Sequence, residues 1–402
     1  MREKLLWLWL SLNYGAGTTV YQKLFNHFGS LEAIYDSDDA DADLISWLNP
    51  SYKRKLLDKN LSYAEEVLDW CDDHDVDIIT PSDQDYPAPL RFIPDYPAVL
   101  YCRGKLPDFE KELCISVVGT RKMTIEGQRN AYELGYGLAK GGAIVVSGMA
   151  KGIDGTAQKG ALYAGGSSVA VLGSGIDVCY PPENFALMQK LINVGAVITE
   201  YPPHTPPNGS NFPVRNRIIS ALSPATVVVE CDLISGALIT AEKAIKQGKT
   251  VFAYPGSVRE HNNQGTNKLL MQGARVATAA IDVLEQFLDK YAHIINISAS
   301  KQKPNIEKFK RVASSSEIPN GFYEKTNKNS EISKEESPKE FDKSTLSSDQ
   351  LLIYDGMEFG KLYTVDALLE IGSSAQEISA LIMMLQLAGA IENVPGGYYI
   401  KK

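Results

Sequence analysis

From Leu113 onward, short apolar runs alternate with longer helical segments, and this alternation restricts the fold more than any other feature of the sequence. The runs are rich in β-branched residues and comprise Cys114–Val118, Ala143–Val146, Val169–Leu172, Ala196–Thr199, Thr226–Glu230 and Val251–Ala253. Segments with helical periodicity lie between them, for example Glu126–Ala139, Asp154–Tyr163, Glu183–Asn193 and Leu238–Gln247. Strands that are apolar on both faces and separated by helices belong to a parallel sheet covered on both sides. The pattern predicts an α/β fold, a doubly wound and mostly parallel sheet over residues 113–290.

The remaining segments differ in composition from this α/β region. Residues 1–75 show helical periodicity, and residues 76–112 are rich in proline and aromatic residues, which favours an extended connector with two short strands. Residues 296–348 are dominated by Lys, Glu, Ser, Asn and Pro, and we expect a flexible linker there. Residues 349–402 suggest three helices followed by a short hairpin around Pro395–Gly397, the pattern of a winged-helix domain.

The first residues superficially resemble a signal peptide. Arg2 and Lys4 precede an apolar run from Leu5 to Leu12, but Ser11 interrupts the run and no small-x-small cleavage site follows promptly. We therefore predict an ordinary buried helix, and no other stretch approaches the apolar length of a membrane span. The five cysteines are scattered and never form a CxxC pair, so we expect no disulfide framework and no metal site in a protein of the cytoplasm.

A glycine-rich turn, Gly15–Thr18, separates two helical runs near the N-terminus. One interpretation is a helix-hairpin-helix, in which such a turn presents backbone amides to a DNA phosphate. The other is a plain corner between two helices. We favour the corner because the turn carries no lysine or arginine.

The loops that follow the predicted strands resemble one another. They are Gly119–Lys122, Ser147–Asp154, Gly173–Asp177, Ser235–Gly236 and Pro255–Ser257. In an open parallel sheet these loops share one edge, where helix N-termini and loop amides bind ligands. Glycines there allow close approach of backbone N–H groups to an anion. The repetition of such loops predicts a phosphate-type anion site.

The common phosphate-binding motifs are missing. Gly173-Ser174-Gly175 has no third glycine to complete G-x-G-x-x-G, which disfavours a dinucleotide cofactor. The sequence also lacks a P-loop and a G-x-S-x-G elbow, so neither a P-loop ATPase nor a serine hydrolase is expected. If these loops are more than structural turns, the sequence favours another kind of phosphate compound as the ligand.

Charge narrows the choice of ligand. The formal net charge of −9 excludes a uniformly basic nucleic-acid binder, so cations must gather locally. They do so at the predicted strand ends: Arg121, Lys122, Lys151, Arg215 and Arg217. Several separated cations suit a polyanion better than one mononucleotide.

Aromatic residues near these cations offer a stacking face for bases, worth about 1–3 kcal/mol per base in single-strand sites. The candidates are Phe212 and Tyr201. Phe212 is equally compatible with a buried position, in which its ring packs in the core under the loop. For Arg217, the competing interpretation is a structural ion pair with a carboxylate at a strand end.

Taken in order, these segments resemble the DNA-processing protein A family, also called Smf. The matching strings are Ser116–Arg121, Ser147–Asp154, Gly173–Asp177, Glu200–Pro203, Phe212–Ser220, Ser235–Thr240 and Gly265–Asn267. The resemblance spans the α/β region nearly end to end and implies an extended Rossmann-like fold. It also implies a helical N-terminal domain of the SAM or helix-hairpin-helix type and a C-terminal winged helix.

By this resemblance the protein would bind incoming single-stranded DNA, protect it, and load the RecA recombinase onto it during natural transformation. It would be a homodimer, with Gly265–Phe287 the candidate surface, and would have no catalytic residues, cofactor or membrane partner. Arg121 matches the family's principal phosphate-binding arginine, Phe212 its base-contacting aromatic residue, and Arg215 and Arg217 its Arg-Asn-Arg string. The full set of residues expected to bind DNA is Gly119, Thr120, Arg121, Lys122, Ser147, Gly148, Lys151, Gly152, Gly173, Ser174, Gly175, Asn211, Phe212, Arg215, Asn216, Arg217, Ser235 and Gly236.

The sequence departs from the family pattern in one place. Many relatives have a DNA-binding lysine three residues before the phenylalanine, where this chain has Gly209. Either one contact is missing, or Lys122 or Lys151 replaces it. We expect weaker or less salt-sensitive binding than in relatives that carry the lysine.

The predicted winged helix is unusually acidic for a DNA-binding domain. Between Asp349 and Ile400 the only cation is Lys361, against the acidic residues Asp349, Asp355, Glu358, Asp366, Glu370, Glu377 and Glu392. Phosphates would repel such a surface. We therefore expect this domain to contact protein, or another part of this chain, rather than duplex DNA.

Two other functions are compatible with the sequence. One is a nucleotide glycosidase of the related Rossmann-like group, with Glu242 acting on the ribose; the Pro-Gly-Gly start of that group's motif is absent here, which makes a solvated helix face the simpler role for Glu242. The other is a scaffold in which the anion site is vestigial. Release of free base, or lack of binding to an oligonucleotide, would distinguish them.

Overall fold

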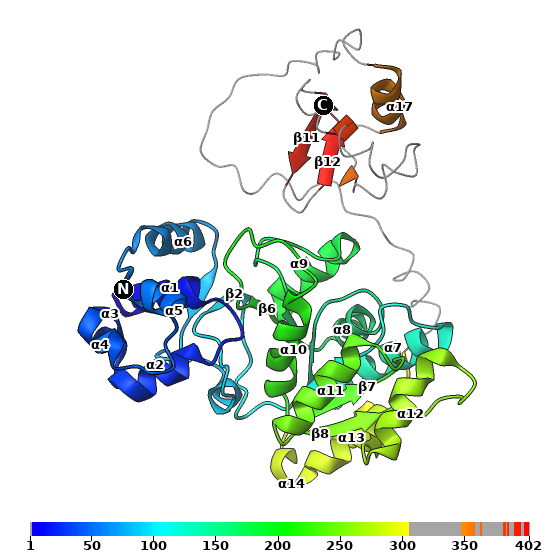
Figure 1. The fold of residues 1–402 in the computed structure, drawn as a ribbon. Helices are drawn as coiled ribbons and strands as arrows, with labels where there is room; N and C mark the ends of the chain where they lie inside the picture. The colour runs from blue at the N-terminus through cyan, green and yellow to red at the C-terminus, as the bar shows by residue number, and fades with distance from the viewer. Residues whose placement is uncertain are drawn as a thin grey trace. The chain divides into compact units, whose positions relative to one another are not determined.

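The computed structural model describes residues 2–304, 347–357, 362–363, 381–382, 384–385, 390–394 and 398–401. The chain divides into two units, Met1–Ser316 and Glu317–Lys402, each with its own internal contacts. The first unit holds a helical N-terminal region and an α/β region (Figure 1). It carries every residue of the predicted site.

The N-terminal region is built from short helices packed around the first of them. They are α1 (Arg2–Tyr14), α2 (Val20–Phe28), α3 (Leu31–Asp36), α4 (Asp39–Asp43), α5 (Pro50–Leu57) and α6 (Ser62–Asp73). Helix α1 is apolar nearly all round and buries Leu6 to Leu10, so it forms the centre of this cluster. Trp7 stacks on Phe25 with the ring centroids 5.1 Å apart. The prediction of a buried helix is confirmed.

The sheet has nine strands in the order β1-β2-β6-β5-β4-β3-β7-β8-β9. Their bounds are β1 Asp77–Ile79, β2 Leu100–Gly104, β3 Cys114–Val118, β4 Ile144–Ser147, β5 Ser168–Val171, β6 Ala196–Thr199, β7 Ala225–Val228, β8 Thr250–Ala253 and β9 Arg275–Val276. The strands from β3 to β9 run parallel. The predicted α/β fold with a mostly parallel sheet is therefore confirmed.

The proline-rich segment is more than a connector. Its two strands extend the sheet, because β2 pairs antiparallel with β6 (Tyr101 opposite Thr199) and β1 pairs antiparallel with β2. The prediction of a separate extended segment was wrong in this respect. Pairing between residues 100 and 199 leaves no local pattern in the sequence, which is why the strands were foreseen but not their place in the sheet.

Helices cover both faces of the sheet. They are α7 (Ile125–Lys140), α8 (Ile153–Tyr163), α9 (Phe185–Val194), α10 (Asn211–Ala221), α11 (Gly236–Lys246), α12 (Gln264–Met271), α13 (Ala280–Leu284), α14 (Leu288–Tyr291) and α15 (Ile297–Ser300). Helices α7, α8 and α13 pack on one face, against Ile115 and Val117 of β3. Helices α10, α11 and α12 pack on the other, against Cys114 and Val118, because alternate residues of a strand face opposite sides. Helices α10 and α11 lie side by side (Figure 1).

The strand order reverses at β3, which has β4 on one side and β7 on the other. At such a point the chain segments that follow the two neighbouring strands diverge to opposite faces and leave a crevice at the carboxyl ends of the strands. The N-terminal helices pack against α9 and against Tyr101 of β2 and Val197 of β6, on the side of the sheet opposite β8 and β9.

The α/β region extends further than expected. We placed its end at residue 290 and the start of a linker at 296, but Ile294, Ile295 and Ile297 pack against the core beside α7. Asn296 N donates to the Gly141 carbonyl at 3.1 Å, which fixes the start of α15. The beginning of the predicted linker is therefore ordered structure, and its residues 305–346 lie outside the described part of the chain.

In the second unit the structure describes α17 (Ser348–Gly356) and a sheet of β10 (Leu362–Tyr363), β11 (Ile391–Val394) and β12 (Tyr398–Lys401). Strands β11 and β12 pair antiparallel, as the predicted hairpin requires. Most of the other predicted helices, Val365–Ile371 and Ile378–Leu387, lie outside the described residues. The winged-helix assignment stays a prediction. Among the described residues, no helix combines the length and apolarity that crossing a bilayer demands.

Candidate nucleic-acid interface

A cleft of about 630 Å³ opens at the carboxyl ends of β3 and β7, at the point where the strand order reverses. Its walls come from the loop after β3, the loop after β7, and the N-terminal turns of α10 and α11. Half of the predicted DNA-binding residues line it: Gly119, Thr120, Arg121, Lys122, Phe212, Arg215, Asn216, Ser235 and Gly236. Segments more than 100 residues apart in the sequence therefore meet in one groove.

Two guanidinium groups lie close to one aromatic ring in this cleft. The Cζ atom of Arg121 lies 4.8 Å from the centroid of the Phe212 ring, and that of Arg215 lies 5.8 Å from it. Arg121 and Lys122 are exposed, whereas Phe212 is half-buried and also contacts Tyr180, with the ring centroids 5.5 Å apart. Positive charge and a π-face thus lie within reach of one ligand.

Arg215 lies buried beneath the cleft. It is 3% exposed, and its Nη1 donates to the Gly148 carbonyl at 3.0 Å and to the Val171 carbonyl. Its Nε donates to Asn216 Oδ1 at 3.2 Å. Burial lowers the pKa of the Arg215 guanidinium to about 10, which still leaves it protonated at neutral pH.

The backbone amides that we expected to hold phosphate donate to the protein itself. Gly119 N and Gly148 N donate to the carboxylate of Asp154, Thr120 N donates to the Glu230 carbonyl at 2.7 Å, and Gly175 N donates to the Thr205 carbonyl at 2.8 Å. The expectation that these amides are available to an anion was wrong. A sequence cannot show which group accepts from a loop amide when the fold alone brings the two together, as it does Thr120 and Glu230.

Most of the strand-end glycines are there for packing. A Cβ atom on Gly119 would come 2.5 Å from Ile153 Cγ1, and one on Gly173 would come 2.9 Å from Phe212 Cδ1. Gly152 has φ +88° and faces the Thr120 carbonyl. Gly236 alone among these has open space in place of a Cβ and is exposed in the cleft.

The predicted hydroxyl and amide donors away from the cleft also have internal partners. Ser147 Oγ donates to the Val117 carbonyl at 2.6 Å, and Ser174 Oγ donates to the Val178 carbonyl at 2.9 Å. Asn211 Nδ2 donates to the Gly173 carbonyl at 3.0 Å. Seven predicted residues therefore support the loops around the cleft without lining it: Ser147, Gly148, Gly152, Gly173, Ser174, Gly175 and Asn211. Tyr201, the alternative stacking residue, is buried and donates to the Asn211 carbonyl at 3.2 Å.

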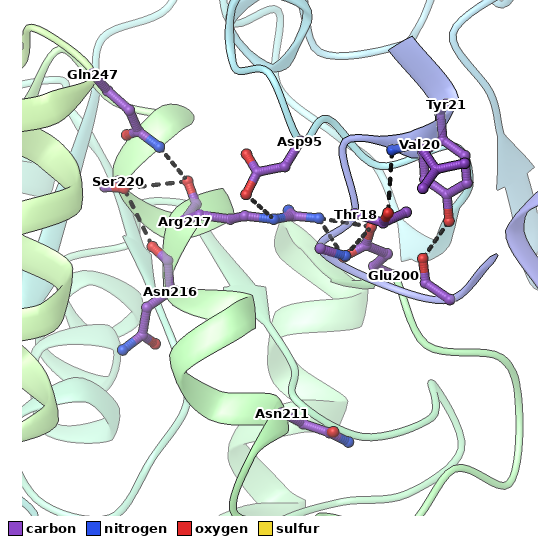
Figure 2. A network of polar contacts seen from close by, with 12 residues as sticks. Thr18, Val20, Tyr21, Asp95, Glu200, Asn211, Asn216, Arg217, Ser220 and Gln247 are labelled. Atoms are coloured by element: carbon purple, nitrogen blue, oxygen red, sulfur yellow. Dashed lines mark hydrogen bonds and ion pairs between the residues drawn. The ribbon is translucent and has the colours of Figure 1, made fainter. Parts of the chain in front are cut away.

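Arg217 is a structural residue. Its guanidinium is buried between two carboxylates, with Nη2 2.6 Å from Glu200 Oε2 and Nε 3.2 Å from Asp95 Oδ2 (Figure 2). The expectation that it binds DNA was wrong, and the competing interpretation, an ion pair with a strand-end carboxylate, is confirmed. Glu200 directly follows β6, and burial raises the pKa of its carboxyl group while Arg217 opposes that rise.

The glycine turn near the N-terminus docks on the same network. Gly17 N donates to Glu200 Oε1 at 3.3 Å, and the Cα of Gly17 lies against the side chain of Val214 on α10. The turn therefore joins the helical region to α10, which agrees with the plain-corner interpretation. Lys151 is exposed, with Nζ 3.9 Å from Glu183 Oε1, and does not line the cleft.

Sequence reasoning missed several residues that line the cleft, and three of them stand out. Tyr180 contacts Phe212, Ile234 is 91% exposed in the loop after β7, and Asp154 lies at the base. Tyr180 follows a predicted strand-end loop and could have been noticed for that reason. Ile234 carries no such signal, because an isolated aliphatic residue in a loop looks the same whether it is buried or exposed. Glu242 is exposed on α11 and is not part of the cleft wall.

Comparison with known proteins places the chain in a family. A family model described as DNA recombination-mediator protein A matches residues 77–288, a range that begins at β1 and so includes the proline-rich segment. Protein Smf of Escherichia coli is 34% identical over 351 residues, which cover 87% of this chain and 82% of that protein. DNA processing protein DprA of Streptococcus pneumoniae is 40% identical over 205 residues, covering 51% of this chain and 72% of that protein.

The fold agrees with this match. The X-ray structure of DNA processing protein A from Streptococcus pneumoniae superposes with a TM-score of 0.60 at 31% identity, and the aligned part covers 67% of this chain and 93% of that chain. The resemblance seen in the strand-end strings is thereby confirmed. The chain belongs to the DNA recombination-mediator protein A family.

Proposed function

We propose that the cleft between β3 and β7 binds the sugar–phosphate backbone of single-stranded DNA, with a base stacked at Phe212. The observation that supports this most directly is that the exposed guanidinium group of Arg121 lies 4.8 Å from the centroid of the Phe212 ring, in a cleft that Lys122 also lines. Cations that follow the backbone and an aromatic face that accepts any base are the usual elements of a single-strand site. In duplex DNA the bases are already stacked and paired, so we expect it to bind more weakly.

The wider function follows from family membership rather than from the cleft. Relatives carry the name DNA processing protein, and we infer that this chain protects incoming single-stranded DNA and delivers it to the RecA recombinase during transformation or recombination. We further infer a homodimer through Gly265–Phe287 and a protein-binding role for the acidic C-terminal unit. Removal of residues 349–402 should then leave single-strand affinity unchanged.

Replacing Arg121 by alanine is expected to weaken binding of a single-stranded oligonucleotide by at least about 1 kcal/mol, roughly fivefold in Kd. Arg121 is exposed at the cleft, so the change removes a phosphate contact without disturbing the core. Fluorescence anisotropy with single- and double-stranded oligonucleotides at two salt concentrations measures the effect.

Arg54→Ala is the matched control for Arg121→Ala. Arg54 is an exposed arginine on α5 in the N-terminal region, so the substitution changes net charge equally and leaves the cleft intact. We expect its affinity to stay within twofold of the wild type. Equal losses in the two variants would place the interaction outside the cleft and contradict the proposal.

Introducing a lysine at Gly209 should strengthen single-strand binding. Gly209 lines the cleft, is exposed, and has no atom within 4 Å of the position of a Cβ, so a longer side chain fits. One added phosphate contact should steepen the slope of log K against log salt by about 0.7. Gly209→Gln tests side-chain length without charge, and we expect no change of slope. A slope in Gly209→Lys equal to that of the wild type would show that no phosphate passes this point.

A further inference from the structure

A buried carboxylate occupies the centre of the sheet edge beneath the cleft. Asp154, the second residue of α8, is 6% exposed. Its Oδ1 accepts from Gly119 N at 3.3 Å and its Oδ2 accepts from Gly148 N at 3.2 Å. These glycines are the first residues after β3 and β4, so one side chain bridges the two central loops.

The counterion of this carboxylate comes from α10. A Cβ atom on Gly148 would lie 2.5 Å from Arg215 Nη2 and 2.7 Å from Asp154 Oδ2, so both charged groups converge on the same backbone atom. Both side chains are buried, and a buried guanidinium without an opposite charge nearby is strongly unfavourable. The carboxylate therefore balances Arg215 from within the protein.

In doubly wound folds, amides at this edge and the N-terminus of the following helix ordinarily receive the phosphate of a ligand. In this chain a protein carboxylate takes that place. We propose that Asp154 is a resident anion that fills the phosphate subsite, neutralises Arg215 and excludes the phosphate of a free mononucleotide.

Asp154 is thus a specificity-determining residue. A ligand must bind in the outer cleft, along Arg121, Lys122 and Phe212, and we expect a polymer of nucleotides there. This inference rests on the proposed function only in identifying that polymer as single-stranded DNA. The occupancy of the phosphate subsite by Asp154 is a separate claim and is tested without DNA.

The first test is chemical rescue. Asp154→Ala removes a carboxylate and opens a space at the base of the cleft that formate can enter, beside two amides and Arg215. We expect a lower thermal midpoint than in the wild type, and replacing chloride by formate at equal ionic strength should raise the midpoint of the variant by about 2–4 °C. The wild type should shift by less than about 1 °C under the same exchange.

Two variants serve as controls. Asp154→Asn keeps the volume and leaves no room for formate, so we expect no rescue. Glu230→Ala removes another buried carboxylate, one that accepts from Thr124 N and Oγ1 and has no ion pair among the described residues. A rise in Asp154→Ala no greater than that in Glu230→Ala would overturn the proposal.

The second test uses phosphate ligands. Inorganic phosphate and adenosine monophosphate should bind Asp154→Ala measurably in calorimetry, at concentrations where the wild type shows no binding. Equal binding to both proteins would overturn the proposal. If Asp154→Ala does not fold in chloride, refolding is compared in chloride and formate. Formate should raise the recovery of folded protein at least severalfold, and equal recovery would also overturn the proposal.

Discussion

Replacing Arg217 by alanine is expected to destabilise the protein by about 3–5 kcal/mol, because one member of a buried ion pair is removed and the other stays behind. Among the described residues, Glu200 would keep only the Gly17 amide at 3.3 Å, since the other groups bonded to its carboxylate belong to Arg217. Asp95 would also lose its partner, at the junction with the N-terminal helices (Figure 2).

The position of the tryptophans makes this prediction easy to measure. All of them lie in the N-terminal helical region: Trp7, Trp9, Trp47 and Trp70. Urea unfolding followed by tryptophan fluorescence therefore reports that region, while circular dichroism reports the whole chain. We expect the fluorescence midpoint of Arg217→Ala to fall further than the circular-dichroism midpoint, because Glu200 and Gly17 connect the region to α10.

Two variants separate charge pairing from general damage. Arg121→Ala removes an exposed arginine and should lower the free energy of unfolding by less than about 0.5 kcal/mol. The double variant Glu200→Gln/Arg217→Met removes both charges and keeps their volume, and it should be more stable than Arg217→Met alone. If Arg217→Ala unfolds at the same urea concentration as Arg121→Ala, the ion pair does not hold the two regions together.

The parts of the fold that could be predicted are those with a local pattern. The buried parallel strands are short runs of β-branched residues with helices between them, so Cys114–Val118 and Ala196–Thr199 were placed to the residue. The pairing of β2 with β6 could not be predicted, because it joins residues about 95 positions apart through backbone hydrogen bonds that any side chains allow. The same holds for α15, whose few apolar residues resemble a loop until α7 is known to cover them.

In the site, the sequence located the edge of the sheet that carries the cleft. It could not show which side chains at that edge are exposed and which are buried. Arg121 and Arg217 are both arginines near a predicted strand end or helix start, yet one is exposed and the other is 1% exposed. The difference is set by Glu200 and Asp95, which come from two other segments. Likewise, glycines at strand ends fit either an approaching phosphate or an approaching side chain. At Gly148 the group that approaches is Arg215.

A pair of glycine substitutions distinguishes these two roles with a large effect. Gly152 has φ +88° and ψ −132°, a conformation that residues with a Cβ rarely adopt, and a Cβ there would lie 2.2 Å from the Thr120 carbonyl oxygen and 2.8 Å from the Cα of Arg121. Gly152→Ala should therefore cost about 2–5 kcal/mol of stability, from backbone strain and from a clash with atoms that cannot rotate away.

The matched substitution is Gly236→Ala at the first residue of α11, where a Cβ meets no atom within 4 Å. Alanine suits a helix better than glycine, so its stability should rise by about 0.4–1 kcal/mol or stay unchanged. Single-strand affinity should fall in Gly152→Ala, because the clash displaces the backbone of Arg121, and it should hold in Gly236→Ala if Arg121 and Phe212 carry the binding. The opposite result would be a stable Gly152→Ala protein with full affinity and a Gly236→Ala protein that no longer binds the oligonucleotide. It would mean that the DNA strand passes over the α11 end of the cleft, and that Gly236 allows a phosphate to approach the backbone there.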